Sequence, residues 1–178
     1  MGAPELTTEA LDLRACEPGD LDILFALWTD PSSKRFLFDD REISREETKR
    51  FLERSEECFR EEGYGLWLFF ERGETSLGGF AGLLRAPLGE ANLIFGTRPD
   101  LWGRGYAFQA ASAVVAYVFD SLGLPRVVAD VDEPNAASIR VLEKLGMRRT
   151  GRRILNERPI LDYEIQNLRL LPRGDVIT

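Results

Sequence analysis

Gly103 and Gly105 stand one residue apart in the stretch WGRGYA (102–107), between a strand-like segment and an alanine-rich one. Glycine has no Cβ, so the backbone at such positions can turn tightly and approach a ligand closely. If a helix begins directly after them, its unpaired N–H groups and its dipole favour an anion, most simply a phosphate or a pyrophosphate. Arg98 and Arg104 stand where they would add positive charge. A tight turn alone also accounts for a bare Gly-x-Gly pair, so both interpretations stay open.

Two familiar phosphate-binding loops do not match this stretch. A Walker loop needs Gly-Lys-Ser/Thr, whereas Gly105 is followed by Tyr106 and Ala107. A dinucleotide-binding fingerprint needs a third glycine where Phe108 stands, and it follows a first strand, whereas this loop comes after three adjacent strand-like segments. Both classes of nucleotide site are therefore excluded.

The residue types that are missing limit the chemistry. Histidine is absent, which excludes Ser-His-Asp and Cys-His catalysis and removes the commonest metal ligand. Cys16 and Cys58 are far apart and outside any CxxC pattern, so we interpret both as small apolar fillers in a reducing cytoplasm. We expect no metal, and any proton transfer must use a carboxylate, Tyr, Ser, a backbone group or water.

Length and charge limit the number of domains and the kinds of partner. The chain of 178 residues fits a single domain spanning 1–178. The net charge of −7 argues against nucleic acid as a partner. No apolar run reaches the ~20 residues of a membrane span, so no membrane association is expected.

The periodicity of apolar residues predicts a mixed α/β domain. The stretch 32–43 reads as a loop or a short helix. Ser44 and Glu47 form a capping box that starts one of the helices. Strands are expected over 11–16, 64–71, 75–87, 91–97, 126–131, 147–155 and 159–168, and helices over 17–31, 44–63, 106–124 and 135–146.

Two motifs together resemble the GNAT superfamily of acetyl-CoA-dependent N-acetyltransferases. WGRGYA matches the family signature Q/R-x-x-G-x-G/A, with Trp102 at the usual Gln or Arg, and Asn135-x-x-Ser138 runs into RVLEKLGM. The branch most similar to this chain contains the ribosomal-protein N-terminal alanine and serine acetyltransferases. The resemblance implies a GNAT-like fold: a mostly antiparallel sheet of about seven strands, splayed in the middle and flanked by about four helices.

The resemblance also implies how acetyl-CoA, the co-substrate, is held. The loop amides would bind its pyrophosphate, and its pantetheine arm would enter between the strand ending near Thr97 and the strand near Val128. Asn135 would cap its helix, bind the pantetheine arm, or do both. The implied coenzyme contacts are Phe95, Thr97, Trp102, Gly103, Arg104, Gly105, Tyr106, Ala107 and Asn135.

The family's usual proton-transfer residues are replaced in this chain. Asn92 stands where many relatives carry a Glu, and Glu90, two residues earlier, is the nearby carboxylate. Leu142 stands where many relatives carry the Tyr that protonates the leaving thiolate. By resemblance, Ser138 is the candidate for that protonation, with water as the rival. Backbone N–H groups within 94–97 are the candidates for stabilising the oxyanion.

Three further groups of polar residues have open interpretations. Asp39 and Asp40 would bind a cationic amine or form a solvated acidic loop. Tyr163 and Glu164 lie on opposite faces of the last strand, so at most one of them faces the site. A basic cluster near the last hairpin would be solvated, contact an acidic partner or bind the 3′-phosphate of the coenzyme; it comprises Arg148, Arg149, Arg152 and Arg153.

We therefore predict an N-acetyltransferase in which an amine attacks acetyl-CoA directly within a ternary complex. The acceptor is a protein N-terminus or a small amine, and the negative net charge favours a cationic one. Self-association as a homodimer stays open. The alternative is a coenzyme-A-binding sensor or interaction module without transferase activity, which the substitutions at Asn92 and Leu142 motivate.

Overall fold

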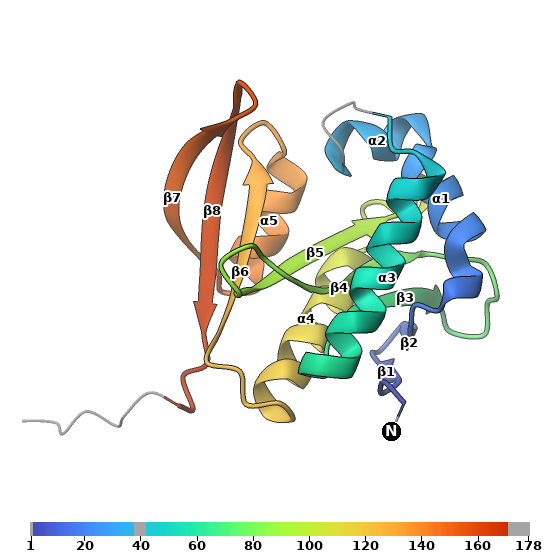
Figure 1. The fold of residues 1–178 in the computed structure, drawn as a ribbon, viewed down its shortest axis with the longest axis horizontal. Coiled ribbons are helices and arrows are strands. Elements are labelled where there is room, and N and C mark those ends of the chain that lie inside the picture. The colour runs from blue at the N-terminus through green and yellow to red at the C-terminus, as the bar shows by residue number, and fades with distance from the viewer. Residues whose placement is uncertain (1, 38–41, 171–178) are drawn as a thin grey trace, which may run out of the picture.

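An eight-stranded sheet runs through residues 2–37 and 42–170, the part of the chain that the computed structural model describes (Figure 1). Its strand order is β1-β2-β3-β4-β5-β6-β8-β7. Neighbouring strands are antiparallel except for β5 and β6, which are parallel. The strands are β1 (Leu6–Thr7), β2 (Leu11–Ala15), β3 (Leu66–Glu71), β4 (Gly79–Arg85), β5 (Ala91–Thr97), β6 (Arg126–Asp132), β7 (Arg148–Leu155) and β8 (Arg158–Gln166).

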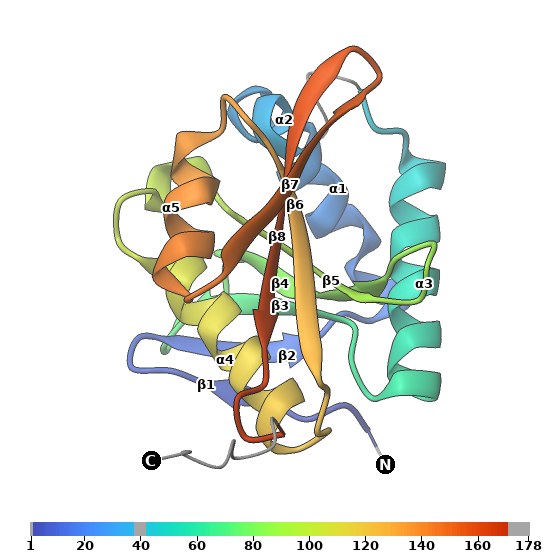
Figure 2. The same cartoon turned by 90° about the vertical axis from the view of Figure 1, so that its left-hand side faces the viewer.

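Helices cover both faces of the sheet. Figure 2 shows α4 and α5 on one side and α3 on the other, with α1 beside α3. The core lies between these layers, where Trp67, Phe69 and Phe80 of the central strands are almost completely buried. The helices are α1 (Leu21–Thr29), α2 (Pro31–Leu37), α3 (Arg45–Glu62), α4 (Tyr106–Asp120) and α5 (Ala136–Lys144), with 3₁₀ turns at Pro18–Asp20 and Pro99–Leu101.

The mixed α/β fold class is confirmed, and two local expectations are corrected. β1 was missed because a strand of two residues is too short to show a period. Pro31 was expected to end a helix, but it begins α2, where its missing N–H costs nothing because first-turn N–H groups have no helical partner. The carboxylate of Asp30 starts this helix by accepting hydrogen bonds from the N–H groups of Ser32 and Ser33 at 2.9 and 3.2 Å.

The predicted capping box of α3 is confirmed. Ser44 Oγ accepts a hydrogen bond from the N–H of Glu47 at 3.1 Å, and Glu47 Oε2 accepts one from the N–H of Ser44 at 2.8 Å. At the other end, Gly63 ends the helix in the left-handed conformation with φ of 82°. α3 therefore begins and ends where its own sequence specifies.

The sheet opens between β5 and β6. These strands are paired only at Asn92 and Val128, near the start of each strand, and then run apart (Figure 1). β5 is paired with β4 along its whole length, from Ala91 to Thr97. Beyond Asn92, the edge of β5 that faces β6 therefore has no ladder partner, and the expected splay in the middle of the sheet is present.

Candidate functional site

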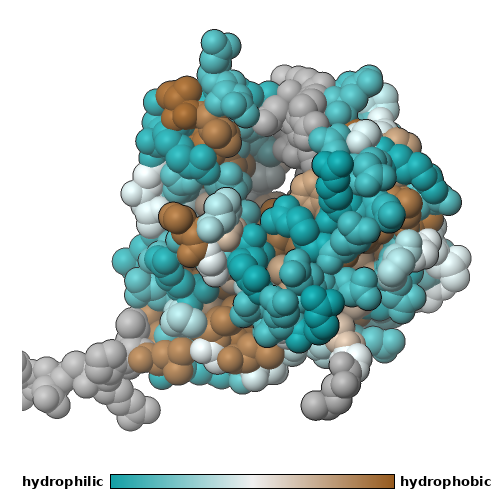
Figure 3. Space-filling view, in the orientation of Figure 1, coloured by the Kyte–Doolittle hydropathy of each residue, from teal (hydrophilic) through white to brown (hydrophobic). Residues whose placement is uncertain are grey.

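A cleft of about 720 Å³ lies where β5 and β6 separate. The space-filling view shows this face of the molecule hollowed between the part formed by β6–β8 and the part formed by α1–α3 (Figure 3). Of the residues that the sequence predicted for the site, the cleft is lined by Phe95, Thr97, Trp102, Gly103, Gly105, Tyr106, Ala107, Asn135 and Ser138. The structure thus brings both motifs to one cavity.

The glycine loop presents a run of unused backbone donors. Gly103 and Gly105 have φ of 80° and 77°, a conformation that side chains with a Cβ rarely adopt, and an added Cβ at either position would meet nothing within 4 Å. Gly105 is the N-cap of α4, and no side chain caps this helix. Among the described residues, no group accepts a hydrogen bond from the N–H groups of residues 103–108. The loop therefore has room and donors for an anion.

One carboxylate fixes the loop from the side. Glu71, the last residue of β3, accepts a hydrogen bond from the Tyr106 hydroxyl at 2.6 Å and pairs with Arg104 at 3.0 Å. Arg98 is likewise engaged, because it pairs with Asp100 at 2.6 Å. Arg98 and Arg104 were expected to add charge at the anion site. Their guanidinium groups form these ion pairs instead, and the Arg104 side chain does not line the cleft.

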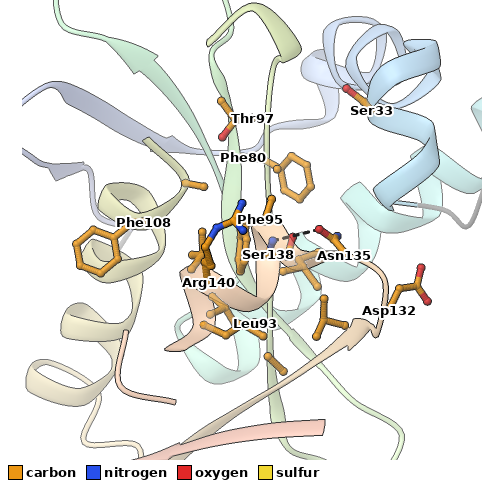
Figure 4. A pocket seen from close by; sticks show the side chains of 18 of the residues that line it. Ser33, Phe80, Leu93, Phe95, Thr97, Phe108, Asp132, Asn135, Ser138 and Arg140 are labelled. Atoms are coloured by element: carbon orange, nitrogen blue, oxygen red, sulfur yellow. Dashed lines mark hydrogen bonds between the residues drawn. The ribbon is translucent and has the colours of Figure 1, made fainter. Parts of the chain in front are cut away.

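α5 brings the second motif to the opposite side of the cleft (Figure 4). Asn135 is 5% exposed and caps the helix, because its Oδ1 accepts a hydrogen bond from the N–H of Ser138 at 3.1 Å. The Ser138 side chain does not complete a reciprocal cap, since the N–H of Asn135 donates to the carbonyl of Asp132. Within the described part of the chain the Ser138 hydroxyl has no hydrogen-bond partner, so it is available to a ligand.

The structure does not bring Glu90 to this cleft. Glu90 lies beyond the start of β5, beside a separate cavity of about 280 Å³, where it pairs with Arg126 at 3.5 Å. Side chains two residues apart on a strand share a face, but the cleft opens at the far end of β5, so a position on the same face as Asn92 does not bring Glu90 to it. Leu142, at the position of the missing Tyr, is 1% exposed and forms part of the cleft wall.

Tyr163 and Glu164 are also outside the lining of the cleft. The Tyr163 hydroxyl is directed to Glu143 of α5 at 3.5 Å, and burial, together with the Glu143 charge, raises the pKa of this phenol. Glu164 is on the other face of β8 and pairs with Arg126 at 2.8 Å. The two side chains do point to opposite faces, as alternation predicted, and neither meets the cleft.

The carboxylates that line the cleft come from β6, and sequence reasoning missed them. Asp130 lies next to Asn92, whose Nδ2 donates to Asp130 Oδ1 at 3.4 Å, and its other oxygen pairs with Arg153 at 3.1 Å. Asp132 pairs with Arg158 at 2.7 Å. Because Ala129 lies opposite Tyr163, on the face covered by α5, the alternating Asp130 and Asp132 point to the face of α1–α3. No local spacing in the sequence links them to the glycine loop.

The cleft also reaches the face of the sheet covered by α1–α3. There its wall contains Trp28, whose ring contacts the rings of Phe51 and Phe80 edge-on at centroid distances of 5.0 and 5.5 Å. Two hydroxyl oxygens in the lining, Ser33 Oγ and Thr97 Oγ1, are buried without a hydrogen-bond partner among the described residues. The lining of the cavity thus comes from both faces of the sheet.

Two groups of candidates remain. Asp39 and Asp40 lie outside the described residues. In the basic cluster, Arg152 pairs with Glu133 at 2.9 Å and Arg153 pairs with Asp130 and with Asp162, so these two arginines are engaged within the protein.

Both cysteines are buried, as expected for apolar fillers. Cys16 and Cys58 are 8% and 5% exposed and do not line the cleft, and burial raises the pKa of the Cys16 thiol. A buried, protonated thiol is a poor nucleophile.

Two further features are absent from the described residues. These residues contain no group of three or more metal-binding side chains of the kinds His, Cys, Asp and Glu. Across 2–37 and 42–170, none of the helices combines the length and the apolar character that crossing a membrane requires.

Comparison with known proteins places the chain in a family. Residues 10–148 match the family described as "Acetyltransferase (GNAT) domain". The chain is 28% identical over 152 residues to the uncharacterized N-acetyltransferase p20 of Bacillus licheniformis, covering 82% of this chain and 83% of that protein.

Solved acetyltransferase structures share the fold. An acetyltransferase from Agrobacterium tumefaciens superposes with a TM-score of 0.81 at 25% identity, over 93% of this chain and 96% of that one. RimL, a ribosomal alpha-N-protein acetyltransferase solved with coenzyme A, superposes with a TM-score of 0.75 at 19% identity, over 92% of this chain and 98% of that one. With the family match spanning most of its length, the chain belongs to the GNAT family of acetyltransferases.

Proposed function

We propose that this protein transfers the acetyl group of acetyl-CoA to a primary amine, which attacks the thioester directly while both substrates are bound. The observation that carries the proposal is the run of N–H groups in residues 103–108 that have no acceptor among the described residues, placed at the open end of the unpaired edge of β5. A diphosphate fits the first feature, because helix N-termini bind phosphate groups. An extended arm with amide groups fits the second, because it can pair with a free strand edge.

The residues beside the cleft can supply the remaining steps. N–H groups of β5 that face β6 lack ladder partners beyond Asn92, so they are available to stabilise the thioester oxygen as it gains charge. When the C–N bond forms and the C–S bond breaks, the sulfur needs one proton and the amine loses one. The Ser138 hydroxyl, free of protein partners in the described part of the chain, is the proposed donor to the sulfur, and it regains its proton from water.

Because Glu90 lies outside the cleft, we assign the removal of the amine proton to Asp130 of β6, which lines it. Asp130 is a carboxylate at the point where β5 and β6 separate, held by Asn92 and Arg153. Its charge favours an ammonium group over a neutral or anionic acceptor, and a water molecule beside it can carry the proton away from the amine. We therefore propose that the acceptor enters from the face of α1–α3 and that the coenzyme enters from the face of α4 and α5.

The acceptor is either a protein N-terminus or a small amine. RimL, which shares the fold, acts on a protein N-terminus by its name, and this supports the first choice. The rings of Trp28, Phe51 and Phe80 offer an apolar wall to the group that follows the amine. Peptides with free N-termini should be compared with polyamines at the same concentration, and the better substrate identifies the acceptor class.

The decisive experiment measures binding and turnover on the same preparation. Calorimetry should detect coenzyme A, and release of its thiol from acetyl-CoA should depend on an added amine. The variant Gly105→Glu should lose both signals, because it places a carboxylate and a strained backbone in the anion site. Binding without turnover on any amine would instead identify a coenzyme-A-binding module. No binding by the unaltered protein would refute the proposal altogether.

A further inference from the structure

Among the residues that the structure describes, four charged side chains line the cleft: Asp130 and Asp132 on β6, and Arg140 and Lys144 on α5. The two carboxylates are paired with Arg153 and Arg158. In contrast, no carboxylate within residues 2–37 or 42–170 pairs with Arg140 or Lys144. Among the described lining residues, the charged side chains without an ion-pair partner are therefore the two cations of α5.

Arg140 and Lys144 share one face of their helix and lie at the same entrance as the glycine loop. They are four positions apart, which stacks them one above the other about 6 Å apart along the helix axis. Lys144 Nζ lies 4.2 Å from the centroid of the Phe108 ring, in the first turns of α4. Figure 4 shows the Arg140 side chain over the cleft, between α5 and α4.

The glycine loop can bind one anionic group, but it has no unpaired cation for a second one. Its backbone donors can serve a diphosphate, but its own cations, Arg98 and Arg104, are paired with Asp100 and Glu71. A phosphate monoester is a dianion near neutral pH, and full cationic charges bind it more strongly than neutral donors do. Coenzyme A carries such a monoester at the ribose 3′ position, next to its diphosphate.

We infer that Arg140 and Lys144 form a binding subsite for the 3′-phosphate monoester of the coenzyme. The inference rests on the proposed function and adds a selectivity to it: the protein distinguishes coenzyme A from dephospho-coenzyme A. Phe108 is a positioning residue, because its ring holds the Lys144 ammonium group at the entrance by a cation–π contact. The subsite replaces the basic cluster of β7 as the partner of this phosphate.

The test compares coenzyme A with dephospho-coenzyme A by calorimetry. The unaltered protein should bind coenzyme A at least about tenfold more tightly. The double variant Arg140→Gln, Lys144→Gln should reduce this ratio to about one while changing the affinity for dephospho-coenzyme A by less than about twofold. Phe108→Leu should give an intermediate ratio.

The matched control is Arg148→Gln, Arg149→Gln, which removes the same charge from β7. Both arginines are exposed, and neither lines the cleft. This control should keep the tenfold ratio. If it lost the ratio as the α5 variant does, the preference would come from the overall positive charge, and the subsite would be refuted. Thermal unfolding of each variant checks that the fold is kept.

The remaining outcomes separate the inference from the function on which it rests. Equal affinity of the unaltered protein for both ligands overturns the subsite and leaves the acetyltransferase proposal standing. An equal loss of affinity for both ligands in the α5 variant also overturns the subsite, because the cations would then serve the diphosphate. Binding of neither ligand by the unaltered protein overturns the proposed function and the subsite together.

Discussion

The Tyr106 hydroxyl donates a hydrogen bond to Glu71 Oε1 at 2.6 Å, and this joins the first residue of α4 to the last residue of β3. Arg104 pairs with the same oxygen at 3.0 Å. The glycine loop is thus held from outside the cleft by a residue that precedes it by more than thirty positions, while its N–H groups have no acceptor in the part of the chain that the structure describes. A loop held in this way is preorganised, so an anion that binds there orders little of the backbone.

Glu71→Gln should therefore weaken coenzyme binding without touching the coenzyme. A hydrogen bond to a charged group contributes about 1.5–3 kcal/mol. When the loop is less well ordered, part of this energy is lost from binding, and Kd should rise about tenfold. Calorimetry with coenzyme A measures the change. Glu74→Gln, an exposed carboxylate in the following turn, is the control and should bind as the unaltered protein does. Unchanged affinity in Glu71→Gln would mean that the loop needs no such support.

Gly105→Ala should destabilise the loop because φ of 77° is costly for a residue with a Cβ. The expected loss of unfolding free energy is about 1–2 kcal/mol, accompanied by at least about a tenfold weaker binding of coenzyme A. Gly123→Ala is the matched control, since Gly123 has φ of 66° and the same open space. It should lose similar stability and bind normally. Similar binding losses in both variants would assign the effect to stability alone.

Ser138→Ala should lower kcat by about tenfold or more while leaving the KM for acetyl-CoA nearly unchanged, if the hydroxyl protonates the thiolate. Stability should hold, because Ser138 contributes its backbone N–H to the helix cap. Asn135→Ala should show the opposite stability result, a loss of about 1 kcal/mol, because it removes the cap. Steady-state kinetics and thermal unfolding separate the two. Full activity in Ser138→Ala would mean that water, and not Ser138, protonates the thiolate.

Replacing both cysteines should leave the catalytic mechanism intact. Cys16→Ala with Cys58→Ala should keep the dependence of rate on both substrates typical of a ternary complex, with intersecting double-reciprocal plots. Both thiols are buried away from the cleft, so neither can carry the acetyl group. Parallel plots for the unaltered protein that are lost in the double variant would indicate a covalent acetyl-cysteine. That result would contradict the direct attack proposed here.

The Arg14–Asp20 pair should make stability depend on acidic pH. Burial acts to raise the pKa of Asp20, but hydrogen bonds from Arg14 at 2.8 Å and from the N–H of Glu17 outweigh it, so the pKa is lowered. A lowered folded-state pKa means that the pair stabilises the fold above the unfolded value of about 4, and that this stabilisation is lost as the pH falls through the folded-state pKa.

Thermal unfolding of the unaltered protein and of Asp20→Asn checks this dependence. The two midpoints should differ at neutral pH and converge as the pH falls well below about 4. Asp22→Asn serves as a control, because Asp22 is an exposed carboxylate in the adjacent helix whose side chain is 75% exposed. A difference between Asp20→Asn and the unaltered protein that stayed constant down to the lowest pH would show that the carboxyl charge is not what stabilises this turn.

Local signals in the sequence determined the elements and one half of the site. The capping box at Ser44 and Glu47 starts α3, and the paired glycines place a helix N-terminus after β5, because hydrogen bonds and φ preferences act over a few residues. The same locality explains why the conformation of the glycine loop and the Asn135 cap were predicted from the chain alone.

Only the tertiary structure decided which charges meet in the cleft. Asp130 comes to the cleft because β5 and β6 part after Asn92, and Glu90 is left on the other side of that single paired position. Arg104 pairs with Glu71 outside the cleft. Arg140 and Lys144 line the cleft and have no carboxylate partner among the described residues. Such pairings join strands and helices distant in sequence, so they depend on strand order and on how the sheet splays, which no local pattern encodes.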